Sequence, residues 1–272
     1  MVEIIRPDVD ILKTALSGQC FRMNKTEDGS FLAVATNKAV KITQQGDRIS
    51  FFCDEAEFDD FWKPYFDLDS DYEEHHKKIP AEDSFLRAAM EYSYGIRILR
   101  QDIWETLISF IISQRKNIPA IKNSVEKLSR MFGEKIKGQD SYSFPEPIKI
   151  ANAKDEELVA CSLGYRVPYV KKTAQLVESG AVNLEKLKTL SDEELMQALC
   201  TLPGVGKKVA SCVMLFAYHR MEAFPRDVWI LRMEDRHYNG SFKEAHYGDS
   251  AGLMQQYMFY FGKSLEYKQI FG

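Results

Sequence analysis

Two helices joined by a tight turn are indicated over residues 191–219, and no other stretch limits the fold as strongly. Ser191 and Glu194 form a capping-box pattern that opens the first helix. Three helix-breaking residues follow it: Pro203, Gly204 and Gly206. Apolar residues then recur at helical spacing, which predicts a second helix from about Lys207 to His219. The N–H groups at the start of that helix can face an anion such as a phosphate.

The segment between residues 21 and 53 predicts a small antiparallel sheet. Its short runs of β-forming residues are separated by turn signals at 28–29 and 45–47. The runs are 31–36, 39–43 and 49–52. Strands joined by such short turns favour an antiparallel meander.

Beyond residue 54 the apolar spacing becomes helical. Asp102 and Glu105 match a second capping box, which opens a strongly apolar helix. A further amphipathic helix begins at 117–119 and ends at Gly133. Smaller helices are expected at 58–62, 81–94, 155–161, 168–178 and 184–187. Because no repeat or long linker separates the sheet from the helices, we expect one compact α+β unit.

The net charge is −4, but the carboxylates are concentrated in one segment. Residues 54–74 contain ten carboxylates and a single basic residue, Lys63. Segments 97–137 and 166–172 are net basic. This distribution predicts one basic face and an acidic, solvated back, with salt-sensitive binding to a polyanion through a limited number of contacts.

The cysteine pattern and the hydropathy of the sequence indicate the cellular compartment in which the protein is expected. The five cysteines are odd in number and lack a Cys-x-x-Cys pair, which predicts free thiols in a reducing environment. They are Cys20, Cys53, Cys161, Cys200 and Cys212. The chain starts without an apolar signal region, and no segment approaches the roughly 20 apolar residues of a membrane span. We therefore expect an intracellular protein, in the cytoplasm or nucleoid of a prokaryote, without a membrane segment.

The run Leu202–Cys212, followed by Asp227, resembles the helix-hairpin-helix superfamily of DNA base-excision glycosylases. Lysine at position 208 makes it similar to the bifunctional 8-oxoguanine DNA glycosylases within that superfamily. Three distant regions match the same family: Ser17–Arg22, Phe66–Asp69 with Arg97–Asp102, and Leu163–Tyr169. The resemblance spans nearly the whole chain. It implies a small N-terminal twisted antiparallel sheet domain, residues 1–95, packed on an all-helical glycosylase domain, residues 96–272, that a DNA-facing cleft divides.

The resemblance implies that Lys208 attacks the sugar C1′ and that Asp227 stabilises the oxocarbenium-like sugar. Only a neutral amine can attack, and a helix start and partial burial both disfavour the ammonium form. The resulting imine allows β-elimination, so strand cleavage is expected beside base removal. Read alone, the residues leave another interpretation, in which Lys207 and Lys208 are solvated and Asp227 merely caps a helix over 228–233.

A glycosylase must flip its target nucleotide out of the duplex, and the resemblance implies which residues replace it. Tyr165 matches the wedge aromatic, for which core packing is the alternative, and Arg166 matches the arginine that reads the opposite base. The loop 113–117 matches the segment that fills the gap, through Arg115 and Asn117. Contacts to the DNA backbone are implied for the hairpin residues Gly204, Val205, Gly206 and Lys207.

Three positions depart from the human-like members of the family. Arg115 stands where they have asparagine, and Ala120 stands where they have a second opposite-base arginine. Without the bidentate donors of that arginine, we expect relaxed selectivity for the base opposite the lesion. Trp229 replaces a histidine, and the sequence assigns it no role.

The damaged base is expected to meet four residues. The resemblance implies that the Gly18 carbonyl accepts the N7–H that 8-oxoguanine has and guanine lacks. Gln255 is implied to bond the Watson–Crick edge, while Phe259 and Cys212 stack on the two faces of the purine. Core packing is the alternative for Phe259.

Two other functions stay open. One is a related glycosylase for alkylated adenine or for adenine mispaired with 8-oxoguanine, against which Lys208 and Gly18 argue. The other is a non-catalytic DNA-binding module, which would have no use for Asp227. No cysteine array or metal-ligand spacing occurs, so we expect no iron–sulfur cluster, metal or other cofactor, although a monovalent cation on the hairpin carbonyls is compatible with the pattern. The expected partner is double-stranded DNA containing oxidised guanine, bound by a monomer.

Overall fold

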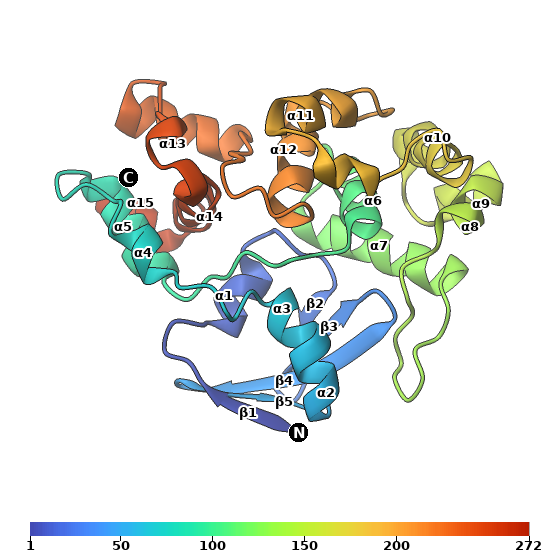
Figure 1. Ribbon diagram of the computed structural model, residues 1–272, viewed down its shortest axis with the longest axis horizontal. Helices are drawn as coiled ribbons and strands as arrows, with labels where there is room; N and C mark the ends of the chain where they lie inside the picture. Colours follow the sequence, from blue (N-terminus) through green and yellow to red (C-terminus); the bar gives the residue numbers. More distant parts are fainter. Residues whose placement is uncertain (272) are drawn as a thin grey trace.

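The computed structural model describes residues 1–271 and contains a five-stranded antiparallel sheet beneath a body of helices (Figure 1). The strand order across the sheet is β1-β5-β4-β3-β2. The strands are β1 (Val2–Ile5), β2 (Met23–Lys25), β3 (Phe31–Ala35), β4 (Lys38–Gln45) and β5 (Arg48–Phe51). The fold is thus α+β, as predicted, and the three expected runs form β3, β4 and β5. The sequence pattern did not indicate β1, which extends the sheet by pairing Ile4 with Ile49 of β5.

The sheet buries one face against a short helical segment. Val40 and Ile42 of β4 alternate with partly exposed neighbours, as expected for a strand with one buried face. Trp62 and Phe66 lie in the same apolar cluster and are fully buried. The covering segment consists of α2 (Glu55–Glu57), a π-helical turn (Phe58–Trp62) and α3 (Lys63–Tyr65). The predicted short helix around residues 58–62 is therefore part of a longer one.

The helical body forms two groups above the sheet (Figure 1). In one group α5 and α13 pack against α14, and in the other α12 packs against α6, and α10 against α8. The first group contains α4 (Glu73–His76), α5 (Ser84–Ser93), α13 (Val228–Tyr238), α14 (Ala251–Gly262) and α15 (Leu265–Phe271). The second contains α6 (Ile103–Ser113), α7 (Ile118–Phe132), α8 (Pro147–Asn152), α9 (Asp155–Ala160), α10 (Val167–Glu178), α11 (Asp192–Cys200) and α12 (Lys207–Phe216). The short α1 (Ile11–Leu16) lies between the sheet and the helices.

Several predicted helix ends need correction. The helix that begins at Lys207 ends at Phe216 rather than at His219, whose φ of 54° lies in the left-handed region. Asp102 caps α6 by accepting the Glu105 N–H at 2.8 Å, but Glu105 does not return the bond, because its carboxylate faces Arg22 at 3.6 Å. The expected helix at 184–187 is a 3₁₀ turn over Lys186–Thr189.

Asp67 joins the sheet region to the helices. It accepts hydrogen bonds from Ser70 Oγ at 2.8 Å and from Arg100 Nε at 2.9 Å, and Nε2 of His219, three residues beyond the end of α12, lies 3.6 Å away. Burial raises the pKa of Asp67, but His219, Arg100 and Ser70 outweigh this and lower it to about 2. Arg97 is fully buried beside it and donates to the Ser70 carbonyl at 2.8 Å. Two of the family-matching motifs therefore meet at this joint.

The apolar side chains form two clusters, one at the sheet and one within the helices. Phe21 from the N-terminal part belongs to the helical cluster, and Leu99 belongs to the sheet cluster. The clusters are therefore interleaved along the chain, and the division at residues 95 and 96 stays a prediction. Within residues 1–271, no helix is both long and apolar enough to cross a bilayer.

Candidate active site and DNA-facing cleft

The predicted hairpin forms between α11 and α12. Ser191 and Glu194 make the expected capping box at the start of α11. Gly204 has a φ of 76°, and a β-carbon there would lie 2.7 Å from the Tyr169 ring, so both conformation and packing require glycine. Gly206 is the N-cap of α12 and offers no side-chain acceptor. The first N–H groups of α12 are therefore not capped by a side chain of Gly206 and are oriented for an external acceptor.

Lys208 lies in the first turn of α12 and is half-buried, whereas its neighbour Lys207 is exposed. The Lys208 ammonium lies 5.1 Å from the centre of the Phe110 ring. Cys212, one turn further along, is buried. Burial raises the pKa of its thiol, and the positive charge of Lys208 beside it opposes that rise. The two lysines thus have different environments, and only Lys208 faces the interior of the cleft.

Asp227 is the N-cap of α13. Its Oδ1 accepts the N–H groups of Trp229 and Ile230, both at 2.9 Å. The capping function considered from the sequence is therefore present. Asp227 does more than cap the helix, because it also lines the same cavity as Lys208 and Cys212. The cap holds the carboxylate at a fixed orientation beside the lysine.

A small cavity of about 50 Å³ opens between the two groups of helices. Its lining brings together both predicted catalytic residues and all four predicted base-binding residues. The lining residues are Gly18, Phe110, Lys208, Cys212, Phe216, Pro225, Asp227, Gln255, Gln256 and Phe259. It adjoins a groove of about 860 Å³, with which it shares Gly18, Lys208 and Asp227.

Gly18 and Phe259 form one wall of the cavity. Gly18 has a φ of 80°, and a β-carbon there would lie 3.0 Å from Phe259 Cε1 and 3.3 Å from Ile118 Cδ1. Only glycine therefore brings the backbone this close to the ring. Phe259 packs against the helical core and also lines the cavity, and its stacking on the base stays a prediction.

Gln255 and Gln256 are both buried in α14. Gln255 Nε2 donates to the Pro225 carbonyl at 3.0 Å, and Gln256 Nε2 donates to Gln255 Oε1 at 3.1 Å. The sequence indicated only Gln255. The signal that could have identified Gln256 is a pair of adjacent amides inside an otherwise apolar helix.

The predicted gap-filling and wedge residues lie on neighbouring loops. Arg115 is exposed with a φ of 53°, and the exposed Asn117 caps α7 by accepting the Ala120 N–H at 2.9 Å. Tyr165 is 53% exposed, which excludes the core-packing alternative. Arg166 is buried, and its Nε donates to the Gln114 carbonyl at 3.0 Å. In this structure the Arg166 guanidinium thus faces the protein rather than the groove.

Gln114 was not predicted as a separate site residue, yet it connects these loops. Its Nε2 donates to the Gly204 carbonyl at 2.9 Å and to the Ile111 carbonyl at 3.0 Å. The Gly204 carbonyl on the hairpin therefore already has one donor. Trp229, whose role was unassigned, lines the groove with the exposed Val228 and Leu231. Its ring lies 5.2 Å from the Arg232 guanidinium.

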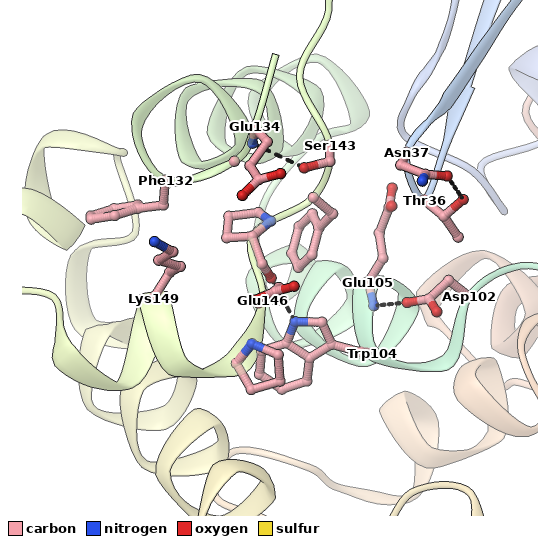
Figure 2. A pocket seen from close by; sticks show the side chains of 14 residues that line it. Thr36, Asn37, Asp102, Trp104, Glu105, Phe132, Glu134, Ser143, Glu146 and Lys149 are labelled. Atoms are coloured by element: carbon pink, nitrogen blue, oxygen red, sulfur yellow. Dashed lines mark hydrogen bonds between the residues drawn. The ribbon is translucent and has the colours of Figure 1, made fainter. Parts of the chain in front are cut away.

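A separate hollow of about 460 Å³ lies between the start of α6 and the segment 133–147 (Figure 2). Trp104 Nε1 donates to the Pro145 carbonyl at 2.8 Å, and the Glu134 N–H donates to Ser143 Oγ at 3.0 Å. None of the predicted site residues lines this hollow. Among the described residues, no group of three or more His, Cys, Asp or Glu side chains is arranged to hold a metal ion.

The arrangement of hairpin, cleft and sheet matches known protein families. Residues 108–247 match the HhH-GPD superfamily of base excision DNA repair proteins, and residues 1–107 match the N-terminal domain of 8-oxoguanine DNA glycosylase. The structure is similar to that of MBOgg1 bound to a low-affinity DNA ligand, with a TM-score of 0.90 and 38% identity, covering 96% of this chain and 94% of that one.

Two further relatives agree. The 8-oxoguanine glycosylase/lyase of Clostridium acetobutylicum, bound to double-stranded DNA with cytosine opposite 8-oxoguanine, has a TM-score of 0.88 and 33% identity over 94% of this chain and 92% of its own. The N-glycosylase/DNA lyase OGG1 of Arabidopsis thaliana is 30% identical over 247 residues, 84% of this chain and 66% of its own. The chain belongs to the 8-oxoguanine DNA glycosylase family of the HhH-GPD superfamily.

Proposed function

We propose that this glycosylase removes 8-oxoguanine from duplex DNA and then cleaves the strand, with Lys208 as the nucleophile. The observation that carries the proposal is the shared cavity, which places Lys208 and Asp227 beside the glycine and aromatic residues expected around the base. The glycosylase and DNA lyase activities follow from family membership. The assignment of individual residues to steps is our own.

In the proposed mechanism, the neutral amine of Lys208 forms a bond to the sugar C1′ while the bond from C1′ to the purine breaks. Asp227 stays ionised and stabilises the positive charge that develops on the sugar ring. Because Oδ1 is held by the helix cap, the carboxylate needs little reorganisation when the charge forms. The Lys208 adduct then opens to an imine. Loss of a proton from C2′ breaks the bond to the 3′ phosphate, and water releases the lysine.

The proposed recognition of the base uses the cavity walls. The Gly18 carbonyl accepts the N7–H of 8-oxoguanine, and the purine stacks between Cys212 and Phe259. A guanine in the same place would present its N7 lone pair to that carbonyl, which leaves two acceptors facing each other. The close approach of Gly18 to Phe259 supports the proposal that both residues contact the same base.

The opposite base is read less strictly in this proposal than by the human-like members. Tyr165, Arg115 and Asn117 occupy the exposed rim that would face the gap. Ala120 offers no hydrogen-bond donor from its side chain, and Arg166 is bonded to the Gln114 carbonyl. We expect comparable excision rates opposite cytosine and opposite the other three bases. A preference for cytosine as steep as that of the human-like enzymes would contradict this.

The accompanying proposals concern partners and location. Lys207 and the hairpin residues Gly204–Gly206 contact the phosphates of double-stranded DNA, and the protein acts as a monomer inside the cell without a cofactor. The exposure of Lys207 at the start of α12 supports the phosphate contact. A monovalent cation bound to the hairpin carbonyls would have to share the Gly204 carbonyl with Gln114, whose Nε2 already donates to it.

The test is borohydride trapping on a duplex with one 8-oxoguanine. We expect the wild type to form a covalent complex and Lys208→Gln to form none. Lys207→Gln is the matched control, since it removes the neighbouring charge from the same helix turn and should still trap. Complex formation by Lys208→Gln would exclude Lys208 as the nucleophile. DNA binding without trapping or base release in the wild type would indicate a binding module, and release of another purine would indicate a related glycosylase.

A further inference from the structure

Gln256 is a buried polar side chain at the cavity that contains Lys208, and its amide oxygen has no hydrogen-bond partner among the described residues. It is 2% exposed and lines the cavity with Lys208 and Gln255. Leaving a buried amide oxygen unpaired is unfavourable, and most buried polar groups have a hydrogen-bond partner, so this oxygen at a cavity is a candidate to accept a bond from a ligand.

The neighbouring bonds fix which end of the Gln256 amide is free. The Pro225 carbonyl can only accept, so the Gln255 nitrogen must face it. Gln255 Oε1 then requires a donor, which the Gln256 nitrogen supplies. Turning the Gln256 amide over would place two oxygens against each other. The unpaired atom at the end of this series of hydrogen bonds is therefore Gln256 Oε1, an acceptor. The Pro225 carbonyl, two hydrogen bonds away, determines this orientation of the amide.

We propose that Gln256 Oε1 accepts an N–H from the Watson–Crick edge of the flipped purine and thereby selects guanine-type over adenine-type bases. A guanine-type edge offers two donors, N1–H and the 2-amino group. An adenine-type edge has a bare nitrogen at N1, whose lone pair would face the amide oxygen. The inference rests on the proposed function of the cavity. It adds a residue, Gln256, that distinguishes the two purine classes independently of the N7–H contact at Gly18.

Within this proposal Gln255 has a second role. Because its amide connects Pro225 to Gln256, it orients the Gln256 amide in addition to any contact of its own. Ring-opened guanine lesions keep the N1–H and the 2-amino group and should be accepted. 8-Oxoadenine keeps the N7–H, but its N1 is bare and its amino group stands at C6 rather than at C2. 8-Oxoadenine, which keeps the Gly18 contact but not the proposed Gln256 contact, therefore separates the two contributions.

The experiment compares the wild type with Gln256→Leu, which keeps the side-chain volume approximately and removes the amide. In single-turnover excision of 8-oxoguanine we expect the variant to be slower by roughly 10- to 100-fold, the range for an unmatched buried polar contact. Strand cleavage at a preformed abasic site should stay within about twofold, because no base is present in that step. Equal loss in both assays, for Gln256→Leu and for Gln256→Ala, would show that Gln256 supports the fold rather than base binding and would overturn the inference.

Selectivity is measured by binding in the Lys208→Gln background, where no lesion is consumed. Adding Gln256→Leu should reduce the affinity ratio between 8-oxoguanine and 8-oxoadenine duplexes by about tenfold. An unchanged ratio would overturn the role of Gln256, even if excision slowed. If the wild type neither excises 8-oxoguanine nor cleaves abasic DNA, the proposed function itself fails, which is a different result. Gln256→Ala provides a second variant if the leucine does not fit.

Discussion

The Gln114 side-chain amide donates to the Gly204 carbonyl at 2.9 Å and so bonds the loop between α6 and α7 to the hairpin before Lys208. The backbone carbonyl of the same residue accepts Arg166 Nε at 3.0 Å. Gln114 therefore connects the expected gap-filling loop, the wedge segment and the hairpin. One residue thus contacts all three segments.

We expect Gln114→Ala to weaken binding to a lesion-containing duplex by roughly 5- to 50-fold. The substitution leaves the Gly204 carbonyl without its side-chain donor and releases the loop, an effect of about 1–2 kcal/mol. Fluorescence anisotropy titration at fixed salt measures it. Gln197→Ala on the exposed face of α11 is the control and should bind as the wild type does. Equal affinity for the two variants would show that the bond to Gly204 is dispensable.

Gly18→Ala should abolish most excision of 8-oxoguanine while the protein stays folded. The new β-carbon would lie 3.0 Å from Phe259 and force a left-handed backbone onto alanine. Gly29→Ala is the matched control, because its φ of 83° carries the same conformational strain but no atom lies within 4 Å. Single-turnover excision distinguishes them: we expect at least a 100-fold loss for Gly18→Ala and near-normal rates for Gly29→Ala. Similar losses in both would mean that backbone strain alone is responsible.

Ala120→Arg should sharpen the preference for cytosine opposite the lesion. Ala120 lies in the first turn of α7, directly after the expected gap-filling loop. An arginine there restores two donors in a planar fork, which distinguishes a base by about 1–3 kcal/mol. Excision rates opposite all four bases should then differ by tenfold or more. Ala120→Lys supplies the charge without the fork and should leave the profile flat; a flat profile for both variants would refute the prediction.

Asp67→Asn should lower the free energy of unfolding at neutral pH, and the difference from the wild type should disappear in acid. The pKa of Asp67 is lowered to about 2, so the ionised carboxylate stabilises the fold above its unfolded pKa of about 3.9. That stabilisation, about 2 kcal/mol, is fully present at pH 7 and is lost as the pH falls toward 2. Asparagine tolerates the φ of 52° at this position. Urea unfolding at pH 7, 5 and 3.5 should show a difference from wild type that narrows only below pH 4.

The hairpin and the strand runs could be predicted because their signals are local. Glycines, proline and a capping box specify the turn, and period-two alternation specifies β4. β1 and α14 were missed for opposite reasons. β1 is stabilised by pairing with β5, some 45 residues later. α14 is buried on nearly all sides and has no amphipathic pattern to detect.

The predicted catalytic and base-binding residues share one cavity, since the family motifs carry that information. Gln114 and Phe110 were missed because they contact segments far along the chain. Gln256 was missed because tertiary packing alone brings it to the same cavity as Gly18 and Lys208. Arg166 shows the converse: the motif indicates its identity, but its orientation toward the Gln114 carbonyl follows from tertiary packing alone.

The cavity wall formed by Gly18 and Phe259 joins residues from near the two ends of the chain. Phe259 lies in α14, close to the C-terminal end, whereas Lys208 lies in the first turn of α12. This wall is complete only when α14 packs against the N-terminal segment. A partly synthesised or partly unfolded molecule thus contains Lys208 without this wall, so the complete cavity is a property of the folded chain.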